Sequence, residues 1–281
     1  MPQKRIAAVL TLACVCFAGG LTASASAQTS PPPPTEKQTV LWMKLEKSIL
    51  DIDRGLDGVM GVAIVDLTDG HKYLLHANDV YPQASSIKIC VLAELYRQAQ
   101  QGKLKLTDLY TVNAADLVED SDIMGGLTPG VTQITLRDTR LRRKMMDLKA
   151  AAEGRENVST PNEMLNLLQA LYRDEILNQE MTADFFKVLS THKESWIPRN
   201  LPDDLRIADK PGALEGVRND SGVIFVDKRP YVLCVMTTYL HRERDGEEAI
   251  SNISLAAWRM FDRLARASEY GRVISPGNSS R

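Results

Sequence analysis

The stretch 82-PQASSIKICVLAELYRQAQQGKL-104 places two serines and a lysine at the start of an amphipathic helix. Its apolar residues recur with the i, i+4, i+8 spacing of one helix face, at Ile87, Val91, Leu92, Leu95 and Ala99. Ser85 and Lys88 are three residues apart, so their side chains lie on one face about one turn apart, within hydrogen-bonding reach. This helix start is interpreted either as a nucleophile with a base beside it or as a serine N-cap followed by a surface lysine.

The catalytic interpretation has a clear chemical basis. A lysine acts as a base only if burial or a second positive charge lowers its pKa below about 10.4. The backbone amides of a first helical turn favour negative charge, so they help to stabilise an alkoxide or a tetrahedral oxyanion formed there.

The Ser-x-x-Lys spacing is not specific by itself, because 190-STHK-193 has it too. Ser190 neither follows a predicted strand nor begins an apolar helix, so we expect a solvated turn after a helix at that position. Ser85, in contrast, follows a predicted hairpin and lies at a strand-to-helix transition. That context favours the catalytic interpretation for Ser85.

Strand patterns occur on both sides of a helical region. Residues 38–54 have helical spacing, and residues 59–78 contain two β-branched runs joined by Thr-Asp-Gly, which predicts a hairpin. Two further β-rich runs lie within residues 222–240, separated by 227-DKRP-230. A helix is predicted after them, from about residue 246 to 265.

The region between these strands is predicted to be mostly helix and loop. Its clearest helix covers residues 160–177, with Thr160 as N-cap, Pro161 at the first helical position and Glu163 completing a capping box.

The order of elements predicts an α+β fold, with one mostly antiparallel sheet flanked by helices and a second, all-helical lobe. The domain is expected over residues 37–267, with a sheet lobe at 37–84 and 201–267 and a helical lobe at 85–200. A ligand-binding cleft between the lobes follows from this arrangement.

The N-terminus has the features of a secretory signal peptide, residues 1–27. Two basic residues precede an apolar run at 6–22, and 25-ASA-27 supplies small residues for cleavage. A transmembrane anchor is the alternative, but two glycines interrupt the run. We therefore expect export to the periplasm or the medium, with a proline-rich linker at 28–36 and a C-terminal tail at 268–281.

Charge and cysteine content limit the function classes. Removing the signal peptide takes the formal net charge from −2 to −4, and no basic patch indicates nucleic-acid binding. Cys90 and Cys234 remain; they could be bridged in an oxidising compartment, but two buried free thiols are favoured. No metal or other cofactor is implied, because the histidines form no ligand cluster: His71, His76, His192 and His241. We expect a monomer that acts on a small molecule and has no membrane contact after signal cleavage.

A second motif extends the catalytic interpretation. In 208-ADKPGALEGVRND-220, Lys210, Pro211 and Gly212 occur on a candidate strand near the middle of the sheet, where glycine lets the backbone approach a ligand. Together with 84-ASSIK-88, this segment resembles the class A β-lactamases and penicillin-recognising serine enzymes, whose signatures are SxxK, SDN and KTG. The resemblance covers about residues 40–267 and implies a serine β-lactamase/transpeptidase-like fold.

The resemblance also implies roles for individual residues. Ser85 would be the acylated nucleophile, Lys88 its proton acceptor, and Lys210 the KTG lysine that supports the substrate carboxylate. The backbone N–H groups of Ser85 and Ala213 would form the oxyanion hole, beside Gly212. Arg218 would add a second carboxylate contact, although an exposed arginine at a strand end is the plainer interpretation.

Three departures from the family pattern bear on activity. Pro211 replaces the KTG threonine, which removes a hydroxyl and a backbone donor. The SDN helix looks deleted, because 121-SDI-123 lacks the asparagine and precedes the segment that SDN follows in the family. Aligning on 139-TRL-141 places Met145 and Lys149 where the family has its deacylating glutamate and an asparagine. Ordinary surface charge explains the nearby carboxylates Asp147, Glu153 and Glu156.

The sequence thus predicts an exported serine hydrolase, acylated on Ser85 by a β-lactam or a related amide or ester and deacylated slowly. The alternative is a non-catalytic pseudoenzyme that keeps the fold and binds a ligand. An α/β-hydrolase is disfavoured, because the chain has no GxSxG motif.

Overall fold

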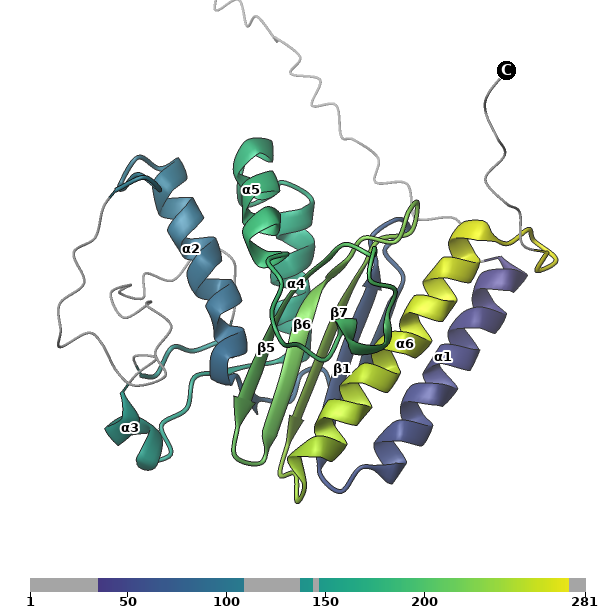
Figure 1. Ribbon diagram of the computed structural model, residues 1–281, viewed down its shortest axis with the longest axis horizontal. Helices are drawn as coiled ribbons and strands as arrows, with labels where there is room; N and C mark the ends of the chain where they lie inside the picture. The colour runs from purple at the N-terminus through teal and green to yellow at the C-terminus, as the bar shows by residue number, and fades with distance from the viewer. Residues whose placement is uncertain (1–34, 109–136, 144–146, 273–281) are drawn as a thin grey trace, which may run out of the picture. The chain divides into compact units, whose positions relative to one another are not determined.

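A computed structural model describes residues 35–108, 137–143 and 147–272, with only the backbone given for residues 148 and 151. The predicted signal peptide, 121-SDI-123 and Met145 lie outside these residues. A five-stranded antiparallel sheet has the order β2-β1-β7-β6-β5, with α1 and α6 against one face and α2, α4 and α5 against the other (Figure 1). The α+β class predicted from the sequence is confirmed.

The terminal helices form one layer. Helix α1, Glu36–Gly55, begins at a complete capping box of Thr35 and Gln38, and α6, Glu243–Arg266, packs beside it (Figure 1). Both were predicted, with ends a few residues further out than the apolar spacing indicated. Their buried face meets the sheet through aromatic contacts, in which Tyr231 stacks on Phe261 with ring centroids 4.0 Å apart. This layer leaves the opposite face of the sheet for the helices that carry the predicted nucleophile.

The strands come from both ends of the domain, as predicted. They are β1 Val59–Asp66, β2 Lys72–Leu75, β5 Ile207–Leu214, β6 Val217–Ile224 and β7 Tyr231–Thr238. The two predicted hairpin-like pairs, β1 with β2 and β6 with β7, are both present.

The predicted place of the Lys210-Pro211-Gly212 strand was wrong. That strand, β5, lies at the edge of the sheet and pairs with β6 alone among the described strands. An edge strand keeps one row of backbone hydrogen-bonding groups open to a ligand, which a central strand would lose to its neighbour. Pro211 also fits an edge strand, because proline cannot donate to a second ladder.

The other face of the sheet carries the helices of the central region. They are η1 Ala84–Ile87, α2 Lys88–Gln100, α4 Pro161–Tyr172 and α5 Gln179–Leu189. Two short helices of the central region lie elsewhere: α3, Leu148–Ala152, lies away from the sheet (Figure 1), and η3, Pro198–Asn200, packs against α6. A short two-stranded sheet, β3 Tyr81–Pro82 and β4 Val158–Ser159, joins this region just before η1. Among the helices in the described part of the chain, none has the length and apolar character needed to cross a bilayer.

The capping box predicted for α4 is only half formed. Thr160 caps the helix, since its hydroxyl accepts from the Glu163 amide at 3.1 Å. The Glu163 carboxylate instead accepts from the Asp138 amide at 2.9 Å and from the amide and hydroxyl of Thr139, each at 2.6 Å. The Glu163 carboxylate therefore binds three donors of a loop about 25 residues earlier in the chain, and not the backbone of its own helix end as the sequence spacing predicted.

Candidate active site

Ser85 lies in a sharp turn between β3 and α2. It is the second residue of η1, and Ala84 before it has a left-handed backbone with φ of 47°. The turn is closed by the Ser86 amide and hydroxyl, which donate to the Gln83 carbonyl oxygen at 3.0 and 2.6 Å. Lys88 follows as the first residue of α2, half-buried and one helical turn from Ser85.

Strand β5 backs directly onto this turn at Gly212. A Cβ atom there would lie 2.5 Å from the Gln83 carbonyl oxygen and 2.8 Å from the Ser86 amide nitrogen. The glycine was predicted to let the backbone approach a ligand; in the structure it also lets β5 approach the backbone of Gln83 and Ser86. Only glycine leaves room for β5 and the serine turn to meet this closely.

An open cavity of 1120 Å³ lies along the outer edge of β5. Its lining includes four of the six predicted site residues: Ser85, Lys210, Gly212 and Ala213. Residues of the loop after α5 and of the segment leading into β5 also line it, among them Trp196, Arg199 and Arg206. The structure therefore brings the serine of one predicted motif and the lysine and glycine of the other to a single cavity.

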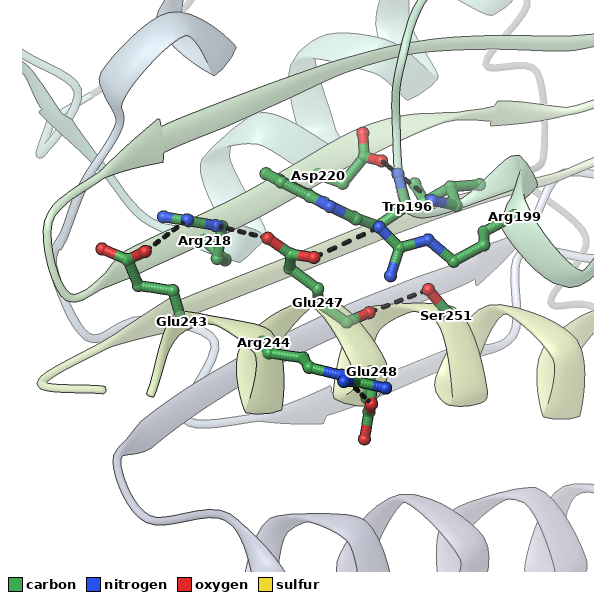
Figure 2. Close-up of polar contacts among 10 residues, drawn as sticks. Trp196, Arg199, Arg218, Asp220, Glu243, Arg244, Glu247, Glu248 and Ser251 are labelled. Carbon is green, nitrogen blue, oxygen red and sulfur yellow. Dashed lines mark hydrogen bonds and ion pairs between the residues drawn. The ribbon is translucent and has the colours of Figure 1, made fainter. Parts of the chain in front are cut away.

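Arg218 takes neither of its two predicted positions (Figure 2). Its Nε donates to Glu247 at 3.0 Å, its Nη2 donates to Glu243 at 2.9 Å, and its Nη1 donates to the Leu214 and Val217 carbonyls, both at 2.8 Å. The side chain is 12% exposed, so it is not the exposed strand-end arginine of the plain interpretation. It is also not among the residues that line the cavity.

In contrast to Arg218, its ion-pair partner Glu247 is one of the residues that line the cavity. This carboxylate also accepts from Arg199 at 3.2 Å, so it links two guanidinium groups (Figure 2). Burial acts to raise the pKa of Glu247, but the hydrogen bonds from Arg218 and Arg199 prevail and lower it. Glu247 therefore keeps its negative charge at the cavity wall.

A buried pair of carboxyl groups, Asp209 on β5 and Asp220 on β6, fastens the cavity wall to the sheet. Asp220 Oδ2 accepts from the Trp196 and Ile197 amides at 3.0 and 2.9 Å (Figure 2). Asp209 Oδ1 lies 3.5 Å from Lys193 Nζ. Burial, and then the charge of Asp209, raise the pKa of Asp220 well above its ordinary value. Asp209 Oδ2 and Asp220 Oδ1 have no other donor among the described residues, so a shared proton satisfies both.

Sequence reasoning missed this pair. The available signal was two aspartates inside strand-like runs, since buried strand positions rarely hold a carboxylate without a partner.

Asp220→Asn is expected to remove a pH dependence of folding stability. Because the folded-state pKa of Asp220 is raised above its ordinary 3.8, its favourable contribution is complete below that pH and is lost as pH rises through the folded-state pKa. Asparagine keeps the acceptor for the two loop amides and does not titrate.

The charged and titratable groups around Asp220 are Asp209, Lys193 and, on β7, Cys234. Urea unfolding across a pH series should show Asp220→Asn gaining stability relative to the wild type as pH rises. Parallel stability curves for the two proteins would contradict the shared-proton interpretation.

The loop after residue 137 is closed next to the serine turn. Arg140 bridges to Val158, and the Asn157 side-chain oxygen accepts from the Arg142 and Arg143 amides at 2.8 and 3.1 Å. The Asn157 carbonyl accepts from the Gln83 amide at 2.7 Å, which joins the base of the loop to the turn that holds Ser85.

The carboxylates near this loop have local partners. Glu156 pairs with Arg143 at 2.9 Å, Glu153 pairs with Arg155, and Asp147 accepts from the Ala150 amide. Lys149 is exposed.

The two remaining expectations concern Ser190 and the cysteines. Ser190 is the C-cap that follows α5, and its hydroxyl donates to the Phe186 carbonyl at 2.7 Å, so the predicted turn after a helix is confirmed. The residue is partly buried and lines the same cavity as Ser85. Cys90 and Cys234 are not bridged; Cys234 is buried and Cys90 partly buried. Burial raises the pKa of both thiols to about 12, which makes neither a nucleophile at neutral pH.

Comparisons with known proteins identify the family of this chain. A family model described as "Beta-lactamase enzyme family" matches residues 44–139 and 131–261. Beta-lactamase SME-1 of Serratia marcescens is 24% identical over 260 residues, which cover 77% of this chain and 88% of that protein. An imipenem-hydrolyzing beta-lactamase of Enterobacter cloacae is 24% identical over 245 residues, which cover 72% of this chain and 84% of that protein.

Solved structures give the same fold. A beta-lactamase from Sphaerobacter thermophilus is 24% identical with a TM-score of 0.68, covering 78% of this chain and 97% of that one. An ancestral class A beta-lactamase is 23% identical with a TM-score of 0.68, covering 77% of this chain and 99% of that one. The chain therefore belongs to the beta-lactamase enzyme family and has the class A beta-lactamase fold.

Proposed function

We propose that this protein is an exported serine hydrolase that is acylated on Ser85 by a β-lactam, or by a related amide or ester, and deacylates slowly. The observation that carries the proposal is the convergence of Ser85 and Lys210, 125 residues apart in the chain, on one cavity along an edge strand. The predicted signal peptide supports export to the periplasm or the medium.

The acylation step follows from the roles that the family resemblance implies for these residues. Lys88 takes the proton of Ser85, and the serine oxygen attacks the carbonyl carbon of the lactam. The amide N–H groups of Ser85 and Ala213 stabilise the oxyanion. The C–N bond then breaks, the nitrogen takes a proton, and the ring-opened substrate stays attached as an ester. Lys210 holds the carboxylate of the substrate through a charge-assisted hydrogen bond.

Slow deacylation is proposed from the loop that follows Thr139. Hydrolysis of the ester requires a base that activates water. The chain has Met145 and Lys149 at the two positions where the family has a glutamate and an asparagine. Three carboxylates near the loop are engaged by local partners: Asp147, Glu153 and Glu156. The acyl-enzyme should therefore accumulate.

A non-catalytic, ligand-binding role is the second candidate. It is favoured by Arg218, whose donors are engaged by Glu243, Glu247 and two carbonyls, and by Pro211, which lacks the hydroxyl of the KTG threonine. Both features weaken recognition of a substrate carboxylate.

Intact-protein mass spectrometry over time separates the candidates. Incubation with benzylpenicillin should add the mass of one whole penicillin, because ring opening releases no fragment, and the adduct should persist and map to the peptide that contains Ser85. Saturable binding without a mass increase would support the pseudoenzyme. A brief adduct, replaced by free hydrolysed penicillin, would contradict slow deacylation.

A further inference from the structure

We propose that Asn219 of β6 is a positioning residue that holds the strained turn before Ser85, so that the serine hydroxyl is presented to the cavity for acylation. This inference rests on the proposed function.

The turn requires stabilising contacts from the rest of the protein, because its backbone is strained at Ala84. The φ of 47° at this residue lies in the left-handed region, which a residue with a Cβ atom rarely adopts. Such a conformation persists only where the surrounding structure imposes it, and it is common next to functional groups. Ala84 is buried, and Ser85 follows it directly.

The Asn219 side chain reaches this turn from the sheet. It is fully buried, and its Nδ2 donates to the Pro82 carbonyl at 2.6 Å. Its Oδ1 accepts from the Thr237 amide at 3.1 Å. The Thr237 N–H can only donate and the Pro82 carbonyl can only accept, so the side-chain amide has a single possible orientation. Asparagine therefore ties β7 and β6 to the chain two residues before Ala84.

Two residues that pair with Asn219 in the sheet also contact this turn. Gly212, its register partner on β5, lies against Gln83 and Ser86. Met236, its partner on β7, accepts a contact from the Gln83 side-chain nitrogen at 3.1 Å. Three adjacent strands thus meet the turn, and Asn219 supplies a direct hydrogen bond to its backbone.

The expected effect of losing this bond is on chemistry more than on binding. Acylation requires the serine oxygen in a near-attack position, and a misplacement of about 1 Å costs roughly 100-fold in rate. The Asn219 side chain hydrogen-bonds to Pro82 and Thr237, and neither of these lines the cavity, so substrate affinity should change little. Asn219→Ala should therefore slow the maximal acylation rate about 10- to 100-fold and change the half-saturating concentration by less than about twofold.

The experiment measures both quantities by stopped-flow acylation with a fluorescent penicillin. The matched control is Tyr96→Phe, which removes one partly buried hydrogen bond between α2 and α5, from the Tyr96 hydroxyl to Asp184 at 2.6 Å. Its acylation rate should equal that of the wild type. Ala84→Gly serves as the second background, because glycine adopts the left-handed conformation without strain. In the Ala84→Gly background, Asn219→Ala should lower the maximal acylation rate only a few-fold.

The outcomes are distinct. An unchanged maximal rate in Asn219→Ala, a change in half-saturation alone, or an equal loss in both backgrounds would overturn the positioning role. If Asn219→Ala does not fold, the double variant with Ala84→Gly should fold and acylate within a few-fold of Ala84→Gly; its failure to fold would also overturn the role. A wild-type protein that is not acylated would refute the proposed function itself, whereas an acylated wild type with unaffected Asn219→Ala refutes only this inference.

Discussion

Ser85→Ala is expected to lose all covalent labelling by a fluorescent penicillin. Alanine has no oxygen to form the ester, and no other described hydroxyl shares both the strand-to-helix turn and the cavity edge beside Lys210. The variant should remain folded, because Ser85 is only partly buried and a smaller side chain fits the turn. The measurement is gel fluorescence after denaturation, with circular dichroism as the check on folding.

Ser190→Ala is the matched control for this experiment, since Ser190 begins the other Ser-x-x-Lys sequence. Ser190 lines the same cavity as Ser85, but its hydroxyl donates to the Phe186 carbonyl and it has no helix start behind it, so labelling should continue. Labelling that survives Ser85→Ala but disappears in Ser190→Ala would move the acceptor to the second motif and refute the proposed nucleophile.

Gly212→Ala is expected to destabilise the protein by roughly 3 kcal/mol or more and to disable the serine turn. Its Cβ would lie 2.5 Å from one backbone atom, the Gln83 oxygen, and 2.8 Å from another, the Ser86 nitrogen. Backbone atoms cannot rotate away as a side chain does, so either β5 or η1 must shift. Urea unfolding gives the stability change, and penicillin labelling reports the damage to the turn.

Gly55→Ala provides the comparison for Gly212→Ala. Gly55 is the last residue of α1, and nothing in the described part of the chain lies within 4 Å of an added Cβ. Because alanine is the better helix former, the change should be neutral or stabilising by up to about 1 kcal/mol. If the Gly212→Ala protein is as stable as the Gly55→Ala protein, β5 can shift at little energetic cost, which would contradict the close packing of β5 on the serine turn.

Local patterns in the sequence were sufficient for most of the elements. The apolar spacing of residues 38–54 predicted α1, and β-branched runs around Thr-Asp-Gly and Asp-Lys-Arg-Pro predicted both hairpin-like pairs. These signals are readable because helix and strand periodicities depend on neighbours a few residues away. The same holds for the placement of Ser85 and Lys88 one turn apart at a helix start.

The positions of individual site residues depended on longer-range contacts. Arg218 was predicted to face a substrate or solvent, but Glu243 and Glu247 of α6 take its donors. Glu163 was assigned to its own helix end, but a loop about 25 residues earlier takes its carboxylate. Polar side chains choose among all donors within reach in three dimensions, and one sequence does not state which ones those are.

By itself, the sequence determined the class of fold, the order of its elements and the two motifs that meet in the cavity. Only the tertiary structure decided that β5 is an edge strand, that Gly212 makes room for the serine turn, and that Asp209 and Asp220 share a buried site. The physical reason is that strand order and side-chain partners are set by packing between segments far apart in the chain. Periodicity, in contrast, records only which face of each segment is buried.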